Sequence, residues 1–357
     1  MEGNAAEKVK ELSAEIEAID ESYGRRAKER WDSIAKPLHG LGLLEDAVCQ
    51  LAAIQRRENP CIKKRALVVF CADNGIVAEG VSQTDSHVTV VVAKNLCLGA
   101  TSVCKMASLA DCHVFPVDMG MKEAVVHERM LDRHVARGTK NFLHEDAMTR
   151  TEAEEAILRG AELAEKLADG GYQLLATGEM GIGNTTTSSA LASVLLNLPV
   201  EEVTGRGAGL SAEGLAHKIH VIKEGLARRK PDGRDAVDML SALGGFDIAG
   251  MAGCMLGAAA KRVPVIMDGL ISQVAALLAV RLCPQVEGYL LASHRGSEKA
   301  SGFLLDALKK RAPVDAQMHL GEGSGAVTLI PLLDMALRVY DEMATFDDIR
   351  IEAYKPL

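Results

Sequence analysis

From Arg65 onward, short apolar runs alternate with longer amphipathic stretches, and this alternation constrains the fold more than any other feature. Each apolar run ends in glycine or polar residues, and the runs span residues 65–72, 112–118, 172–177, 263–268, 288–293 and 315–320. Stretches with helical periodicity separate them, at 87–110, 151–168, 212–229, 246–261, 271–282 and 297–311. Continuous apolar strands separated by helices are typical of a parallel sheet with helices on both faces. The sequence therefore predicts an α/β fold with a doubly covered, mainly parallel, six-stranded Rossmann-like sheet.

The two ends of the chain predict a second, helical unit. Apolar residues recur at helical spacing within 4–34, on a charged background, and need a partner surface. The last helix, expected at 324–343, is long enough to leave the sheet and pack against them. We expect N-terminal helices over 1–60, a large catalytic α/β domain over 61–330, and a C-terminal helix over 331–357 that completes a small helical domain.

Composition excludes several classes of protein. The net charge of -9 and the lack of a basic stripe argue against a nucleic-acid partner. The eight cysteines form no CxxC pair, which favours buried thiols in a reducing compartment. The first 13 residues are charged rather than apolar, and the apolar stretches are interrupted before membrane-spanning length. We expect a cytoplasmic protein with no membrane contact.

The polar residues that follow the apolar runs predict where the site lies. Ligands of parallel sheets bind beyond the carboxyl ends of the strands, so these residues are expected to meet at one rim. They are Asp73, Asn74, Asp118, Glu179, Asp268, Ser293, His294 and Glu322.

One strand, ending at Thr177, runs directly into a glycine-rich loop and a helix start at 178–189. Its candidate phosphate contacts are Gly181, Gly183, Asn184 and Thr185, because glycines let backbone N–H groups approach a ligand and a helix N-terminus favours anions. The spacing resembles a nucleotide-triphosphatase loop, but Asn184 stands where that loop needs lysine. We interpret it as a phosphate cradle and reject an NTPase. The alternative is an ordinary turn capped by Thr185.

A second loop, Gly205–Ser211, precedes a helix that carries Lys218. Gly207, Ala208, Gly209 and Lys218 are candidate phosphate contacts, although a Gly-x-Gly-x-Gly pattern alone is weak evidence. A solvent-exposed lysine is an equally good interpretation of Lys218.

Glu322 stands between Gly321 and Gly323. Flanking glycines make sense if this carboxylate lies in a tight pocket, where desolvation would raise its pKa and suit it to be a general base. The alternative is an acid stabilised at a helix N-terminus. A third hypothesis is a metal-dependent phosphosugar or nucleotide hydrolase using Asp73, Asp118 and Asp268. No zinc spacing of histidines is present, and an Asx turn explains Asp73 at least as well.

These residues resemble the nicotinate-nucleotide:dimethylbenzimidazole phosphoribosyltransferase family, which makes α-ribazole phosphate for the lower ligand of cobamides. The resemblance runs from about Lys36 to the end of the chain. Its blocks lie at 36–37, 41–45, 72–82, 178–186, 205–207 with Lys218, 243–249, 268–269, 292–298 and 320–323.

The resemblance implies a role for each site residue. Glu322 corresponds to the base that takes the acceptor's proton, and Glu179 to a second functional glutamate. Gly181, the 207–209 loop and Lys218 correspond to phosphate contacts, and Ala78, Ser86 and Met180 to the base pocket. It implies inversion to an α-riboside with release of nicotinate, with no cofactor or metal. It also implies a homodimer, with a heterodimer with a paralogue as the alternative.

The chain departs from the family pattern at several places, and two of them, Ala78 and Ser86, concern base choice. Asn74 replaces the usual histidine, and Ala78 and Ser86 replace the serine and glutamine that commonly meet the base nitrogens. Losing both partners would weaken selection for dimethylbenzimidazole, so other benzimidazoles, purines or phenols are candidate acceptors. Gly296 stands where the family commonly has serine. A competing interpretation is a non-catalytic or base-selecting subunit of a two-component transferase.

Overall fold

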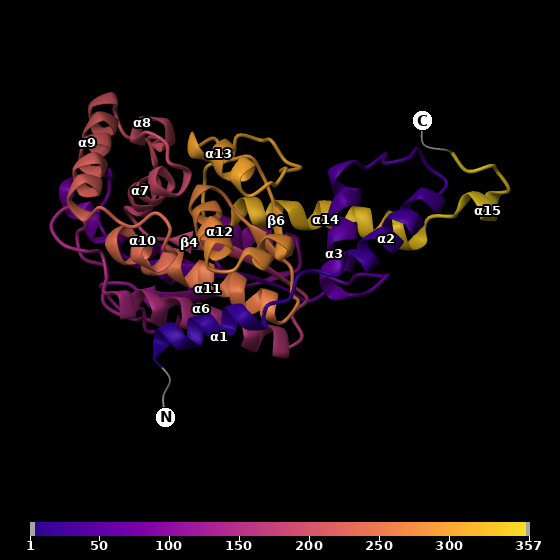
Figure 1. Cartoon of the computed structure of the whole chain (residues 1–357), viewed down its shortest axis with the longest axis horizontal. Helices are drawn as coiled ribbons and strands as arrows, with labels where there is room; N and C mark the ends of the chain where they lie inside the picture. Colours follow the sequence, from indigo (N-terminus) through magenta and orange to yellow (C-terminus); the bar gives the residue numbers. More distant parts are fainter. Residues whose placement is uncertain (1–3, 355–357) are drawn as a thin grey trace.

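The computed structural model describes residues 4–354, and in them a six-stranded, all-parallel sheet forms the centre (Figure 1). The strand order is β3-β2-β1-β4-β5-β6, and each neighbouring pair is parallel. The strands are β1 (Arg65–Ala72), β2 (Cys112–Gly120), β3 (Leu131–Asp132), β4 (Leu174–Met180), β5 (Val265–Met267) and β6 (Leu290–Ala292). The predicted α/β class and parallel sheet are confirmed.

The sixth strand is not the one that was predicted. The stretch 315–320 is not a strand, because Gln317 adopts a left-handed φ of 52° that interrupts an extended chain. Only Val314 forms an isolated parallel bridge, with His294. The sixth strand is instead β3, two residues long, which pairs with β2 at the opposite edge.

Helices cover both faces of the sheet, as β1 shows. Its residues Ala66, Val68 and Phe70 join one hydrophobic core, whereas Leu67 and Val69 join another. The helices of the first core include α6 (Arg150–Asp169), α7 (Asn184–Leu196), α9 (Ala212–Arg229), α10 (Ala236–Leu243), α11 (Phe246–Ala260), α12 (Leu270–Leu282) and α13 (Ala300–Ala307). The second core includes α3 (Leu43–Gln55), α4 (His87–Cys97), α5 (Ser102–Leu109) and α14 (Ser324–Glu342).

The predicted helix over 87–110 is two helices, α4 and α5. The chain breaks between them at Gly99, whose φ of 69° favours glycine. Within the described residues, His87–Leu109 is long and apolar enough to cross a membrane by length and composition, a test that core helices also pass.

A helical extension projects from one end of the sheet (Figure 1). It contains α2 (Glu21–Ser33), part of α14 and the short α15 (Phe346–Ile349), with α3 at its base. The Trp31 and Tyr340 rings meet edge to face at 5.0 Å, and Arg30 Nε donates to the Tyr340 carbonyl. The first helix, α1 (Ala5–Glu15), lies instead against α6 and α11. The exact domain boundaries stay a prediction.

Candidate active site

A cavity of about 210 Å³ lies at the carboxyl ends of β4, β5 and β6. Glu179 at the end of β4, Asp268 after β5 and His294 after β6 all line it. The loop that carries Glu322 lines the same cavity. Asp73 and Asn74, which follow β1, are fully buried and do not line it. The predicted rim therefore exists, and the cavity occupies the part over β4 to β6.

The Glu322 turn has an unusual backbone. Gly321, Glu322 and Gly323 have φ values of 85°, 61° and 88°, and a non-glycine residue in this region is uncommon. Gly178 of β4 permits the turn to rest on the sheet, because a Cβ there would lie 2.4 Å from the Glu322 carbonyl oxygen. The Asp268 carboxylate accepts the Gly323 N–H at 3.1 Å and also the Ala326 N–H at 3.1 Å. The surrounding fold thus fixes Glu322 in place.

The Glu322 carboxyl is half-buried. Burial raises its pKa above the ordinary range, and the Val103 N–H and Thr101 hydroxyl at the start of α5 partly oppose this. Its Oε2 is buried without a hydrogen-bond partner among the described residues. An unpartnered carboxylate oxygen with a raised pKa has the properties of a general base. Glu322 also precedes α14, whose N-cap is Gly323, so the helix-terminus interpretation is compatible with the same geometry.

Glu179 is part of a buried polar group at the wall of the cavity. Asn184 Nδ2 donates both to Glu179 Oε2 and to Asp247 Oδ2, the latter at 3.1 Å. Burial raises the pKa of Glu179 to about 8, and it raises the pKa of Asp247 to about 6. A pKa raised to about 8 favours the protonated form of Glu179 at neutral pH. The sequence assigned no role to Asp247, although it follows the Gly244-Gly245 pair of a resemblance block.

Lys218 is not an exposed lysine, so that interpretation is wrong. It is 1% exposed, it lines the cavity, and its Nζ donates to Thr185 Oγ1 at 2.9 Å. Burial lowers the pKa of Lys218 to about 8. Gly207, with φ 53°, completes this corner, because a Cβ there would lie 2.9 Å from Thr185 Oγ1.

The N-terminus of α7 opens beside that corner. Its N-cap is Gly183, with φ 91° and no side-chain capping bond. The alternative in which Thr185 caps an ordinary turn is therefore wrong, since its hydroxyl serves Lys218 instead. An uncapped helix N-terminus beside a buried lysine has the geometry and charge that favour an anion.

The remaining candidate residues divide into two groups. Met180, Gly181, Asn184 and Ala208 line the cavity. Gly209, Ala78 and Ser86 are not among the described residues that line it. The Gly209 carbonyl accepts from Gln83, Ala78 is exposed on the 3₁₀ helix Gly75–Glu79, and Ser86 precedes α4. Between the last two positions, Val81, Ser82 and Gln83 face the cavity instead.

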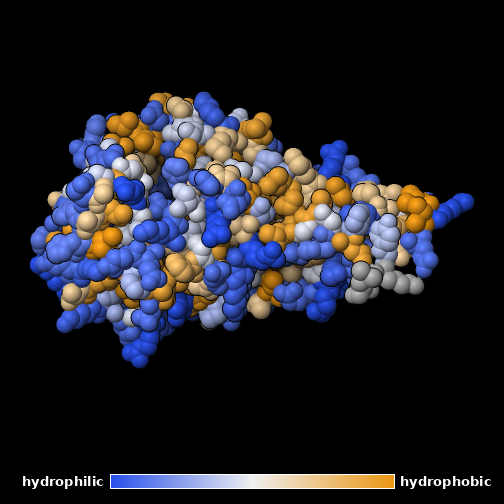
Figure 2. Space-filling model, turned by 90° about the horizontal axis from the view of Figure 1, so that it is seen from above, coloured by the Kyte–Doolittle hydropathy of each residue, from blue (hydrophilic) through white to orange (hydrophobic). Residues whose placement is uncertain are grey.

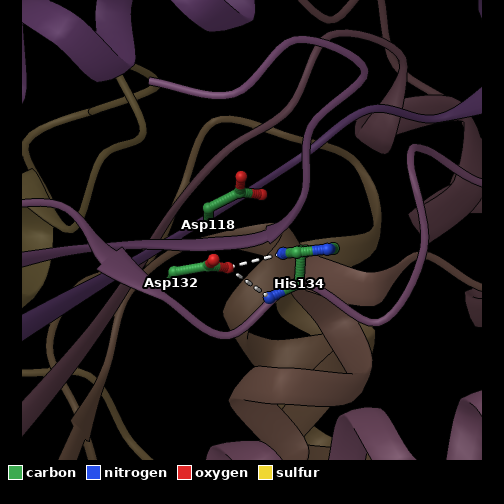
Figure 3. Close-up of side chains that lie close together, drawn as sticks. All are labelled: Asp118, Asp132 and His134. Atoms are coloured by element: carbon green, nitrogen blue, oxygen red, sulfur yellow. Dashed lines mark hydrogen bonds and ion pairs between the residues drawn. The ribbon is translucent and has the colours of Figure 1, made fainter. Parts of the chain in front are cut away.

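The proposed metal triad is not assembled in the described part of the chain. The group of potential ligands found there is Asp118, Asp132 and His134, without Asp73 or Asp268 (Figure 3). The Asp118 oxygens already accept from the Met121 N–H and Arg137. Asp132 Oδ1 accepts from the His134 N–H and lies 2.5 Å from its Nδ1 (Figure 3). The Asp118 carboxylate and the Asp132–His134 pair thus already have hydrogen-bond partners within the protein.

Comparison with known proteins adds independent findings. A family model described as phosphoribosyltransferase matches residues 16–351. The nicotinate-nucleotide–dimethylbenzimidazole phosphoribosyltransferase of Clostridium acetobutylicum is 42% identical over 349 residues, covering 98% of this chain and 99% of the relative. The enzyme of the same name from Ruminiclostridium cellulolyticum is 44% identical, covering 93% of this chain and 95% of the relative. The crystal structure of CobT from Thermus thermophilus superposes with a TM-score of 0.89 at 38% identity, covering 93% of this chain and 100% of that one.

Proposed function

Since the chain belongs to the nicotinate-nucleotide–dimethylbenzimidazole phosphoribosyltransferase family of enzymes, we propose that it moves 5-phosphoribosyl from nicotinate mononucleotide to a lower-ligand base. The acceptor is dimethylbenzimidazole or another benzimidazole, a purine or a phenol. The product is the α-riboside monophosphate, and nicotinate is released.

One observation carries this proposal: the positively charged end of α7 beside Lys218 and the Glu322 carboxyl, whose pKa is raised, line the same cavity. Lys218, Thr185 and Gly207 meet at the N-terminus of α7, where the 5′-phosphate would bind. Glu322 and Glu179 line the same cavity, where the ribose and the two bases would meet. A phosphate anchor and a proton acceptor in one cavity are what this transfer requires.

In the proposed reaction with a benzimidazole or purine, Glu322 removes the N–H proton of the incoming base as its other ring nitrogen attacks the anomeric carbon. The new C–N bond forms on the face opposite nicotinate, which inverts the configuration. The old C–N bond breaks with its electron pair passing to the pyridinium nitrogen, so the leaving group becomes neutral at that atom. Glu179, protonated at neutral pH, donates a hydrogen bond within the site.

Base choice is proposed to rest with the 78–86 segment. Val81, Ser82 and Gln83 line the cavity. Ala78 and Ser86, which differ from the serine and glutamine of the family pattern, flank them in the sequence. The family's serine and glutamine contacts to the base have no counterpart at Ala78 and Ser86, and losing such contacts weakens discrimination between acceptors. We therefore expect the enzyme to accept several bases.

The test is to incubate the purified protein with nicotinate mononucleotide and a mixture of bases. Nicotinate release would be followed, and the nucleotide products identified by mass spectrometry. The absence of nicotinate release with every base would refute the proposed reaction. A β-riboside product would refute inversion alone.

We also propose a homodimer of this chain. Large apolar side chains are exposed on α14 and beyond it, at Met335, Ile349 and Ile351 (exposed fractions 62%, 46% and 55%). Figure 2 shows hydrophobic residues gathered over this narrow end of the molecule. Light scattering of the pure chain measures the assembly. Activity that appears only after a paralogue is added would favour the two-component alternative.

A further inference from the structure

The His294 ring is held rigidly by its surroundings. It is 4% exposed, and a Cβ on Gly325 would lie only 1.9 Å from its Nδ1. Gly269 and Gly296, both of which line the cavity, lie against its other nitrogen: a Cβ on them would be 3.6 and 3.7 Å from Nε2. Three glycines therefore form the slot that this ring fills.

The hydrogen bonds around the ring fix its tautomer. Ser293 Oγ donates its single proton to the Met267 carbonyl at 2.7 Å. Ser293 Oγ also lies 3.0 Å from His294 Nδ1, and it can only accept there. Nδ1 of the neutral ring therefore carries the proton. The Asp268 carboxylate is 3.9 Å from Nδ1, and its oxygens are engaged by Gly323 and Ala326.

Nε2 is consequently a hydrogen-bond acceptor, and it lies beside the cavity-lining residues Gly269 and Gly296. It has no hydrogen-bond partner among the described residues, and it is not among the side-chain atoms that are sealed from solvent. A nine-tenths buried polar side chain with its free atom at a cavity wall is an arrangement suited to a ligand.

We propose that His294 orients the nucleotide substrate by accepting a hydrogen bond at Nε2 from a ribose hydroxyl. An acceptor at this position needs a donor from the ligand. The phosphate and the nicotinate carboxylate of nicotinate mononucleotide offer none at neutral pH, whereas the ribose hydroxyls do. The inference rests on the proposed function. It gives His294, which the sequence placed at the rim without a role, a contact with the substrate.

Such a contact contributes to turnover as well as to binding. The reacting carbon belongs to the same sugar ring, and hydrogen bonds to sugar hydroxyls can strengthen as positive charge develops on the ring during glycosyl transfer. Because Ser293 and the three glycines fix the imidazole, no reorganisation is needed when the nucleotide binds.

The test compares nicotinate mononucleotide with its 2′-deoxy and 3′-deoxy forms in the wild-type enzyme, His294→Ala, His294→Gln and the control His220→Ala. His220 is an exposed residue of α9. We expect the wild type and H220A to prefer the ribose form over one deoxy form by about 10- to 100-fold in kcat/KM, and H294A to lose most of that preference. H294Q keeps part of it, since its amide oxygen reaches the Nε2 position.

Two outcomes would overturn the inference. One is a wild-type enzyme that uses all three nucleotides equally well. The other is an active H294A, or an active H294Q if H294A does not fold, that discriminates at least as strongly as the wild type. A wild-type enzyme inactive with nicotinate mononucleotide itself would refute the proposed function instead.

Discussion

Replacing Lys218 with methionine should make the protein more stable and much less active. Lys218 is 1% exposed, and its ammonium group contacts one hydroxyl, on Thr185. Burial lowers its pKa from 10.5 to about 8. That shift corresponds to about 3 kcal/mol by which the folded state disfavours the charged form. Methionine removes this cost, and it fills much of the same volume.

The pH dependence has a definite sign. Below pH 8 the lysine is charged in both the folded and the unfolded state, so the folded protein bears the full cost. Between about pH 8 and 10.5 the unfolded state binds more protons, and the free energy of unfolding due to this group rises with pH. K218M should therefore show its largest stabilisation below pH 8, and the advantage should shrink towards pH 10.5.

Activity should change in the opposite direction. A lysine cation about 4 Å from a phosphate charge contributes about 4 kcal/mol at an effective dielectric constant of about 20, or about a thousandfold in kcat/KM. The assays are urea unfolding between pH 7 and 10 and nicotinate release. Lys223→Met on the same helix is the matched control, because Lys223 is exposed and pairs with Glu201. A K218M protein that is less stable than the wild type at pH 7, or that keeps full kcat/KM, would contradict the reasoning.

Three further predictions concern the carboxylates and the turn. Glu322→Gln should lower kcat by about 100- to 10,000-fold with an unchanged circular dichroism spectrum, and undiminished turnover would show that Glu322 is not the base. Because burial raises the pKa of Glu179 to about 8, the unfolded state ionises first as pH rises from 4.5 to 8, and stability from this group falls over that window. Urea unfolding at pH 5 and pH 8 should show a smaller loss in Glu179→Gln than in the wild type, and an equal loss would be inconsistent with a buried neutral Glu179. Gly178→Ala places a Cβ 2.4 Å from the Glu322 carbonyl oxygen and should lower kcat more than tenfold. The control Gly233→Ala, whose Cβ meets only a 3.4 Å contact, should not lower kcat. Equal kcat values in the two variants would argue against the close packing of β4 on the Glu322 turn.

Local patterns predicted the layers of the fold well, because period and burial are properties of short segments. β1 is an unbroken apolar run, and a strand buried on both faces has to be one. The prediction of a strand at 315–320 was wrong because it depended on a backbone angle rather than on apolar composition. A single left-handed residue, Gln317, ends the extended path, and nothing in the local composition specifies that angle.

The site divides in the same way. The glycine-flanked Glu322 and the 178–189 loop were found from sequence because both carry a backbone requirement that glycine makes visible. The burial of Lys218 was not predictable. On its helix the residue is one polar position among several, and only the packing of the Gly207 loop and Thr185 over it removes it from water.

The order of residues along the chain was enough to predict the parallel sheet, the rim where polar residues gather, and the glycine-rich loop after β4. The pKa shifts of the ionisable groups at that rim depend on how distant segments pack together. Protonation depends on desolvation and on neighbours brought from distant segments, as Asp247 is brought to the Asn184 side chain that also contacts Glu179. Asn184 and Asp247 are 63 positions apart, and a contact over that separation produces no periodic pattern in the sequence.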